Sequence, residues 1–156
     1  MTKVLPLKKF IPLSKSFNIL EDQGLSYHTL ADQDLVLLIN AAREGIRYQA
    51  FVAISGQLPF TMAEWSAYLL LSGRTMQRYK RERKTFDQSS SEKILEIILL
   101  YRYGEQVFTG KEPFNFWLQT SNLALGGKRP KDYLDSSFGI NLLKDELFRI
   151  EQGLLA

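Results

Sequence analysis

Apolar residues recur at steps of three and four along most of the chain, and no long stretch alternates between apolar and polar positions. Steps of three and four place side chains on one face of an α-helix, whereas alternation is typical of strands. The pattern begins near residue 32, after a segment in which Pro6 and Pro12 interrupt any long helix and Gly24 suggests a turn. We therefore predict an all-α chain preceded by an irregular N-terminal arm at residues 1–30.

Three helices are predicted between residues 32 and 71. The first covers DQDLVLLINAARE, with acids in its first turn and Gly45 after its end. The second covers IRYQAFVAISG and ends near Gly56. The third covers TMAEWSAYLLL, in which Thr61 is followed three residues later by Glu64. That spacing is a capping box, which is a specific signal for a helix start.

A long apolar helix is predicted in SSSEKILEIILLYRYGEQVF, where Ser89 and Glu92 have the spacing of a second capping box. Its apolar positions lie almost all round the helix: Ile94, Leu95, Ile97, Ile98, Leu99 and Leu100. Such a helix must be buried on most faces, so we expect it to join two halves of the molecule. A small domain covers so many apolar faces with difficulty, and we therefore expect a homodimer.

Shorter helices are predicted in the last third of the chain. One covers EPFNFWLQTSNLAL, with Pro113 in its first turn, and GGKRP ends it. PKDYLDS forms a short helix, and the last helix runs from about Gly139 to Gly153. This last helix carries an apolar stripe on one narrow face, made of Ile140, Leu143, Leu147, Ile150 and Leu154.

The charge of the chain is concentrated in one segment. SGRTMQRYKRERK, residues 72–84, holds six basic residues and one acid, so the remainder is net negative although the chain carries +3. With the third predicted helix, this segment forms two helices joined by a tight break at residues 71–73. In a helix-turn-helix the second helix enters the major groove, where Gln and Arg read base edges and further cations meet phosphates. The candidate DNA-binding residues are Ser72 as helix cap, Arg74, Thr75, Gln77, Arg78, Lys80 and Arg81.

The alternative interpretation of this segment is a solvated, charged surface helix. One feature departs from the usual pattern, because many such turns carry an early glycine where this chain has Leu70 or Leu71. Gly73 could supply the flexibility instead, or the turn could be distorted. Met76 and Tyr79 lie three residues apart and are expected to pack inward.

Composition argues against several function classes. The chain has no cysteine and one histidine, His28, which lies in the arm, so neither a thiolate metal site nor a Ser-His-Asp site is expected. GGK at 126–128 is not a phosphate loop, because Asn122 and Arg129 stand where glycine and Ser/Thr are required. We predict a non-enzyme without cofactor or metal. The start of the sequence lacks the apolar run of a signal peptide, and no run suffices to span a membrane, so we expect a cytoplasmic protein.

The C-terminal third resembles a known family. The resemblance rests on Phe108, Trp117-Leu118, the run from Asn122 to Gly127 (NLALGG), Pro130, Leu134, Gly139, Leu147, Arg149-Ile150 and Gly153. These recur in order over residues 104–154, as in the toxin-binding domain of the Xre/MbcA/ParS antitoxins. Residues 45–103 resemble the Xre-type helix-turn-helix half of the same antitoxins, with SGRTMQRYKR at the recognition helix.

The resemblance implies the antitoxin of a type II toxin–antitoxin system. Such antitoxins usually partner a RES-domain toxin that degrades NAD or transfers its ADP-ribose, occlude its active site, dimerise and repress their own operon. On this basis the domains are an arm at 1–30, a helix-turn-helix domain at 31–103 and a toxin-binding domain at 104–156. The candidate toxin-binding residues are Gly126, Gly127, Lys128 and Arg129 in a cationic turn, and Arg149, Glu151, Gly153, Leu154 and Leu155 near the C-terminus.

Two other functions remain open from the sequence. One is a transcription regulator without a toxin partner, and the other is an adaptor that has lost DNA binding. Trp117, Leu118, Leu125, Leu134 and Ile150 are expected in the core more than at an interface.

Overall fold

The computed structural model describes residue 26 and residues 32–153, and these form helices joined by short turns. In chain order they are α1 (Asp32–Glu44), α2 (Tyr48–Ser55), α3 (Met62–Tyr68), α4 (Gly73–Glu82), α5 (Gln88–Val107), α6 (Lys111–Gln119), the 3₁₀ helices η3 (Leu123–Leu125) and η4 (Pro130–Tyr133), and α7 (Ser137–Glu151). Among these residues there is no β-strand, only two isolated bridges, Arg47 with Thr85 and Asn122 with Lys128. The predicted all-α class is confirmed.

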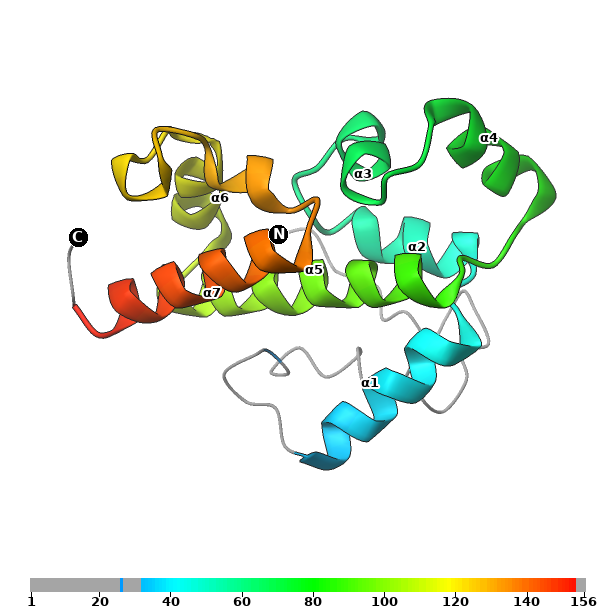
Figure 1. The fold of residues 1–156 in the computed structure, drawn as a ribbon, viewed down its shortest axis with the longest axis horizontal. Helices are drawn as coiled ribbons and strands as arrows, with labels where there is room; N and C mark the ends of the chain where they lie inside the picture. The colour runs from blue at the N-terminus through cyan, green and yellow to red at the C-terminus, as the bar shows by residue number, and fades with distance from the viewer. Residues whose placement is uncertain (1–25, 27–31, 154–156) are drawn as a thin grey trace.

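The long helix α5 is the centre of the molecule (Figure 1). α7 runs beside it, α1 packs on it as well, and α2, α3 and α4 gather near its N-terminal end. Residues 94, 95, 97–101, 103 and 104 of α5 are all buried within the one chain. The predicted spine is therefore confirmed, but the apolar faces that led us to expect a homodimer are covered by the protein's own helices.

The N-cap residues of α3 and α5 can be compared with those predicted. At α3 the capping box is present, since Glu64 N donates to Thr61 Oγ1 at 3.1 Å and Thr61 N donates to Glu64 Oε1 at 3.3 Å. At α5 the prediction of Ser89 as cap is wrong. The cap is Asp87, whose Oδ1 accepts from Ser90 N at 2.8 Å, because an aspartate immediately before the helix satisfies the same free amides.

The C-terminal elements have different bounds from those predicted. The helix expected to reach Leu125 ends at Gln119, after which η3 forms a separate turn. The segment after Pro130 is a 3₁₀ helix, and α7 begins at Ser137 rather than Gly139 because the Ser136 side chain accepts from Gly139 N. On α7, Ile140, Leu143 and Leu147 are buried as the stripe predicted, while Ile150 is half-buried.

Two aromatic clusters complete the core. The first surrounds Phe51, whose ring lies 5.2 Å from both the Trp65 and the Phe86 rings. The second surrounds Phe114 of α6, which meets the rings of Tyr101, Phe108 and Trp117 at 5.2–5.8 Å. Since Tyr101 belongs to α5, this second cluster fastens the C-terminal elements to the central helix. The expected domain boundary at 103/104 lies inside α5, so both halves share that helix.

Candidate functional sites

The two helices α3 and α4 form a capped two-helix unit with a tight turn. Leu71 N donates to Ser66 O at 2.9 Å, which closes the turn behind α3. α4 then begins under the cap of Ser72, whose Oγ accepts from Thr75 N at 3.0 Å. The predicted cap at Ser72 is confirmed.

The residue with left-handed backbone in this turn is a leucine. Leu70 has φ 55° and its side chain is 78% exposed. Gly73 is the first residue of α4 and has no left-handed φ, and a methyl group added there would meet no atom within 4 Å, so its conformational freedom is unused. The suggestion that Gly73 supplies the flexibility is wrong: the turn forms with a leucine in the position that glycine usually occupies.

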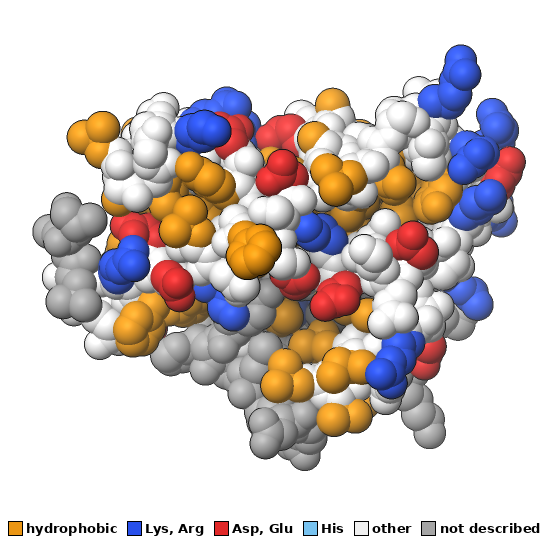
Figure 2. Space-filling model, viewed as in Figure 1, with side chains coloured by type: hydrophobic (Ala, Val, Ile, Leu, Met, Phe, Trp, Pro, Cys, Tyr) orange, Lys and Arg blue, Asp and Glu red, His pale blue; other side chains and the backbone are white. Residues whose placement is uncertain are grey.

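The outer face of α4 is basic. Met76 is buried and the Tyr79 ring lies 5.2 Å from the Phe86 ring, which fixes the inner face as predicted. The residues that face solvent are Arg74, Gln77, Arg78, Lys80 and Arg81, with Thr75 half-buried. Figure 2 shows the resulting group of basic side chains at the α4 end of the molecule. Ser72 and Thr75 also bond to each other through their hydroxyls at 2.9 Å.

The charges on α4 are little neutralised within the described part of the chain. Lys84 pairs with Glu82 at 3.3 Å and lies 5.8 Å above the Tyr79 ring. No ion pair joins Arg74, Arg78 or Arg81 to another described residue. A surface with several unneutralised cations attracts polyanions such as the DNA backbone.

The turn at residues 122–128 is held by its own hydrogen bonds. Asn122 N donates to Lys128 O at 3.0 Å, Gly127 N donates to Asn122 O at 2.9 Å, and the Asn122 side chain accepts from Ala124 N at 2.9 Å. Gly126 and Gly127 have φ of 71° and 78°, values that glycine adopts without strain. The Tyr133 hydroxyl donates to Leu125 O at 2.6 Å, and Leu125 is buried beneath the turn.

The cations of this turn differ in their surroundings. Lys128 is exposed, whereas Arg129 donates to both oxygens of Asp132, at 3.1 and 3.0 Å. The Arg129 guanidinium lowers the pKa of the Asp132 carboxyl. A partner would find Arg129 already engaged, which leaves Lys128 as the more available charge.

The end of α7 also uses its charges internally. Arg149 pairs at 2.9 Å with Glu146, a glutamate whose side chain is almost wholly buried. Glu151 accepts from the Tyr103 hydroxyl at 2.7 Å, and burial together with this carboxylate raises the pKa of Tyr103. Gly153 is exposed with φ 71° and ends the helix. Leu154 and Leu155 lie outside the described residues.

An ion pair connects α3 with η4. Lys131 Nζ of η4 lies 3.2 Å from Glu64 Oε2 of α3, and the same oxygen accepts from the Tyr68 hydroxyl at 3.2 Å. Burial raises the pKa of Glu64, but the Thr61 amide and the Lys131 ammonium outweigh it, so the pKa lies below its ordinary value. The helix-turn-helix unit and the C-terminal elements are therefore in contact through a partly buried charge pair.

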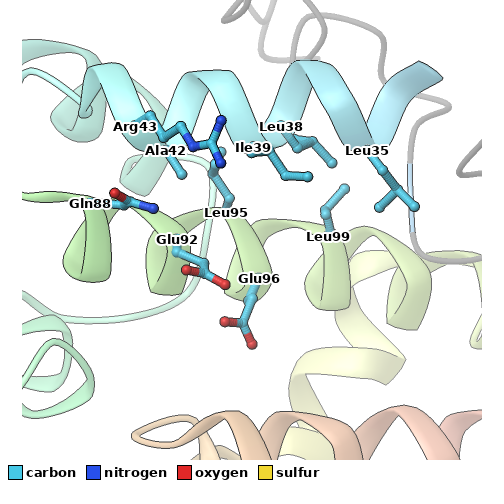
Figure 3. Close-up of a pocket in the computed structure, with 10 residues that line it drawn as sticks. All are labelled: Leu35, Leu38, Ile39, Ala42, Arg43, Gln88, Glu92, Leu95, Glu96 and Leu99. Atoms are coloured by element: carbon cyan, nitrogen blue, oxygen red, sulfur yellow. The ribbon is translucent and has the colours of Figure 1, made fainter. Parts of the chain in front are cut away.

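A groove of about 420 Å³ lies between α1 and α5 (Figure 3). Its floor and walls are mostly apolar, from residues such as Leu38, Leu95 and Leu99, while Glu92 and Glu96 lie along one side. Burial raises the pKa of Glu96. Within residues 32–153 no group of His, Cys, Asp or Glu is placed to hold a metal ion, and no helix is long and apolar enough to cross a membrane. His28 lies outside the described residues.

Comparison with protein families assigns both halves of the chain. Residues 37–98 match the antitoxin Xre-like helix-turn-helix domain, and residues 104–153 match the antitoxin Xre/MbcA/ParS C-terminal toxin-binding domain. Together the matches cover well over half of the chain, in the order the sequence resemblance predicted. They support an Xre-type antitoxin, and neither family is one of enzymes. No curated protein matches the chain.

Proposed function

We propose, from the premise that this chain is an Xre-type antitoxin, that it neutralises a cognate RES-domain toxin and represses its own operon. The toxin would be an NAD-consuming or ADP-ribosylating enzyme of a type II system, and residues 104–156 would occlude its active site. α4 would bind operator DNA, which places the protein in the cytoplasm with its operon. The chain itself would catalyse no reaction and hold no cofactor.

The observation that carries the DNA-binding half is the outer face of α4. Arg74 and Arg78 lie one helical turn apart on the exposed side, with Gln77 between them. Arg and Gln can each pair bidentately with a base edge, and Lys80 and Arg81 follow for phosphates. The closed turn before α4 supports this role, because the two-helix unit keeps its geometry despite Leu70.

Replacing Arg74 and Arg78 by alanine tests this assignment. Each bidentate contact with a base edge contributes about 1–3 kcal/mol, so loss of both should weaken operator binding strongly. Removal of two cations from the DNA-facing surface should also lower the slope of log affinity against log salt. Binding to the DNA upstream of the reading frame is measured by fluorescence anisotropy between about 50 and 200 mM salt. As a control, Lys111 and Lys128 are changed to alanine, which removes the same number of positive charges from a part of the chain outside α4. An unchanged slope and affinity in the arginine variant would refute the role of α4.

Co-expression tests the toxin half. The neighbouring reading frame is expressed alone and with this chain while cellular NAD is followed. NAD should fall with the neighbour alone and recover when both are present. A harmless neighbour would favour the transcription regulator without a toxin.

Deletion of residues 151–156 tests the proposed contact of the C-terminal tail with the toxin. We expect the truncated protein to lose protection against the toxin while it still binds the operator. Full protection by the truncated protein would refute the tail contact.

The homodimer remains part of the proposal, but on a different surface. Since α5 is covered, α1 offers the better surface for a second copy, because it exposes several large apolar residues: Leu35, Val36, Leu37 and Ile39. A helix-turn-helix that reads two half-sites needs such a pairing. Changing Val36 and Ile39 to glutamate should convert a dimer into a monomer in light scattering at micromolar concentration. A wild-type monomer would refute the homodimer.

A further inference from the structure

The toxin-binding domain exposes large apolar side chains that its own fold does not use. Leu123 is 94% exposed, Phe138 is 91% exposed and Phe116 is 74% exposed. Two of them, Phe116 and Leu123, lie seven residues apart on the unit formed by α6 and η3. Figure 2 shows hydrophobic side chains projecting at this end of the molecule.

Leu123 stands on a turn that the structure holds firmly. Its carbonyl accepts from Gly126 N at 3.1 Å, and its neighbour Asn122 makes the hydrogen bonds that close the turn at Lys128. Two residues on, Leu125 is buried and its carbonyl accepts from Tyr133. The turn therefore points one leucine into the core and presents the other to solvent in a fixed position.

A single exposed leucine needs no special explanation on a protein surface. Three further features distinguish this one. The presenting turn is pre-organised, which reduces the entropy lost on binding. The adjacent helix exposes a phenylalanine as well. Gly127 at the tip carries no side chain, and a methyl group there would meet nothing within 4 Å, so a partner can approach the backbone closely.

We infer that Leu123 and Phe116 are the hydrophobic anchors of the toxin interface, an inference that rests on the proposed antitoxin function. The fitting partner surface is an apolar pocket bordered by acidic groups, because Lys128 beside the turn is exposed and Arg129 is already paired with Asp132. Anchors of this kind carry most of the binding energy of an interface, and surrounding charges contribute less.

The test uses the full chain and the protein encoded by the neighbouring reading frame. Leu123→Ala and Phe116→Ala are each measured for affinity by biolayer interferometry. Each variant should bind at least about tenfold more weakly, as expected when an interface anchor is truncated. The matched control is Leu70→Ala, which removes an exposed leucine from the helix-turn-helix unit and should bind as wild type.

Stability separates loss of binding from loss of fold. Since both anchor side chains are mostly exposed, their truncation should leave the thermal midpoint nearly unchanged. If wild type binds the neighbour and both variants bind within about twofold of it, the inference is overturned while the proposed function stands. If the wild-type chain itself does not bind the neighbouring protein, the proposed antitoxin function is refuted, and with it the inference that rests on it. Weakened binding with an unchanged midpoint and a normal Leu70→Ala control supports the inference.

Discussion

Gly104 of α5 lies directly against a buried aromatic ring of α6. A methyl group built on it would collide with the ring of Phe114. Phe114 is fully buried and is enclosed by the rings of Tyr101, Phe108 and Trp117. The ring is therefore closely surrounded by other aromatic side chains. Gly104→Ala should force α6 away from α5.

The expected change in the free energy of unfolding follows from two opposing effects. In a free helix, alanine is more stable than glycine by about 0.8–1 kcal/mol. Inserting a methyl group into a packed core usually costs about 1–3 kcal/mol, and the collision here involves backbone-anchored atoms on one side and an enclosed ring on the other. Because the methyl group would overlap several ring atoms, the cost lies at the upper end of that range, and after subtraction of the helix preference we expect Gly104→Ala to lower the free energy of unfolding by about 2 kcal/mol.

Gly73→Ala is the matched control. Gly73 also lies in a helix, but a methyl group there meets nothing within 4 Å. Only the higher helix preference of alanine remains, so the free energy of unfolding of this variant should rise by up to about 1 kcal/mol. Urea denaturation of the full chain, followed by circular dichroism, measures both changes on one scale.

A double-mutant cycle with Phe114→Leu identifies the cause. A smaller, flexible side chain at 114 makes room for the methyl group, so Gly104→Ala should cost less in that background than in wild type. The reasoning would be refuted if Gly104→Ala stabilised the protein as Gly73→Ala does. It would also be refuted if the cost were the same in both backgrounds.

Three further predictions concern polar groups. Ser91 is fully buried and its Oγ accepts from Ile46 N at 2.9 Å, so Ser91→Ala should cost about 1–3 kcal/mol in urea denaturation by leaving that amide unpaired. Lys131→Met should lower the free energy of unfolding by about 1 kcal/mol, because Lys131 and Glu64 form a partly buried ion pair between the two halves. A double-mutant cycle with Glu64→Gln should show that the two substitutions are not additive. Glu64 and Asp132 both have lowered pKa values in the folded protein, so the stability they contribute is complete near neutral pH and is lost as pH falls below about 4. Lys131→Met should flatten this acid dependence in a series of thermal midpoints, and an unchanged curve would count against the pair.

Local signals in the sequence predicted much of the fold. Thr61 with Glu64 marked the start of α3, and Ser72 marked the start of α4, because a helix cap involves only neighbours in the chain. The apolar positions of α5 predicted its burial for the same reason. Where several caps competed, as at Asp87 and Ser89, the local signal was ambiguous and the prediction failed.

Candidate sites were predicted less completely, because availability for binding depends on distant neighbours. The sequence located Arg129, Arg149 and Glu151, yet their pairing with Asp132, Glu146 and Tyr103 exists only in the folded chain. The exposure of Phe116 was likewise invisible, since apolar residues at helical spacing are normally core.

The sequence by itself determined the all-α class, the basic helix α4 and the motif run of the C-terminal domain. These depend on residue type and on spacing within a few turns. Only the tertiary structure decided that α5 is covered within one chain, that Leu70 takes the left-handed position and that Leu123 faces solvent while Leu125 does not. The reason is physical: burial, charge pairing and backbone strain are set by segments that meet after folding, and no local pattern contains that information.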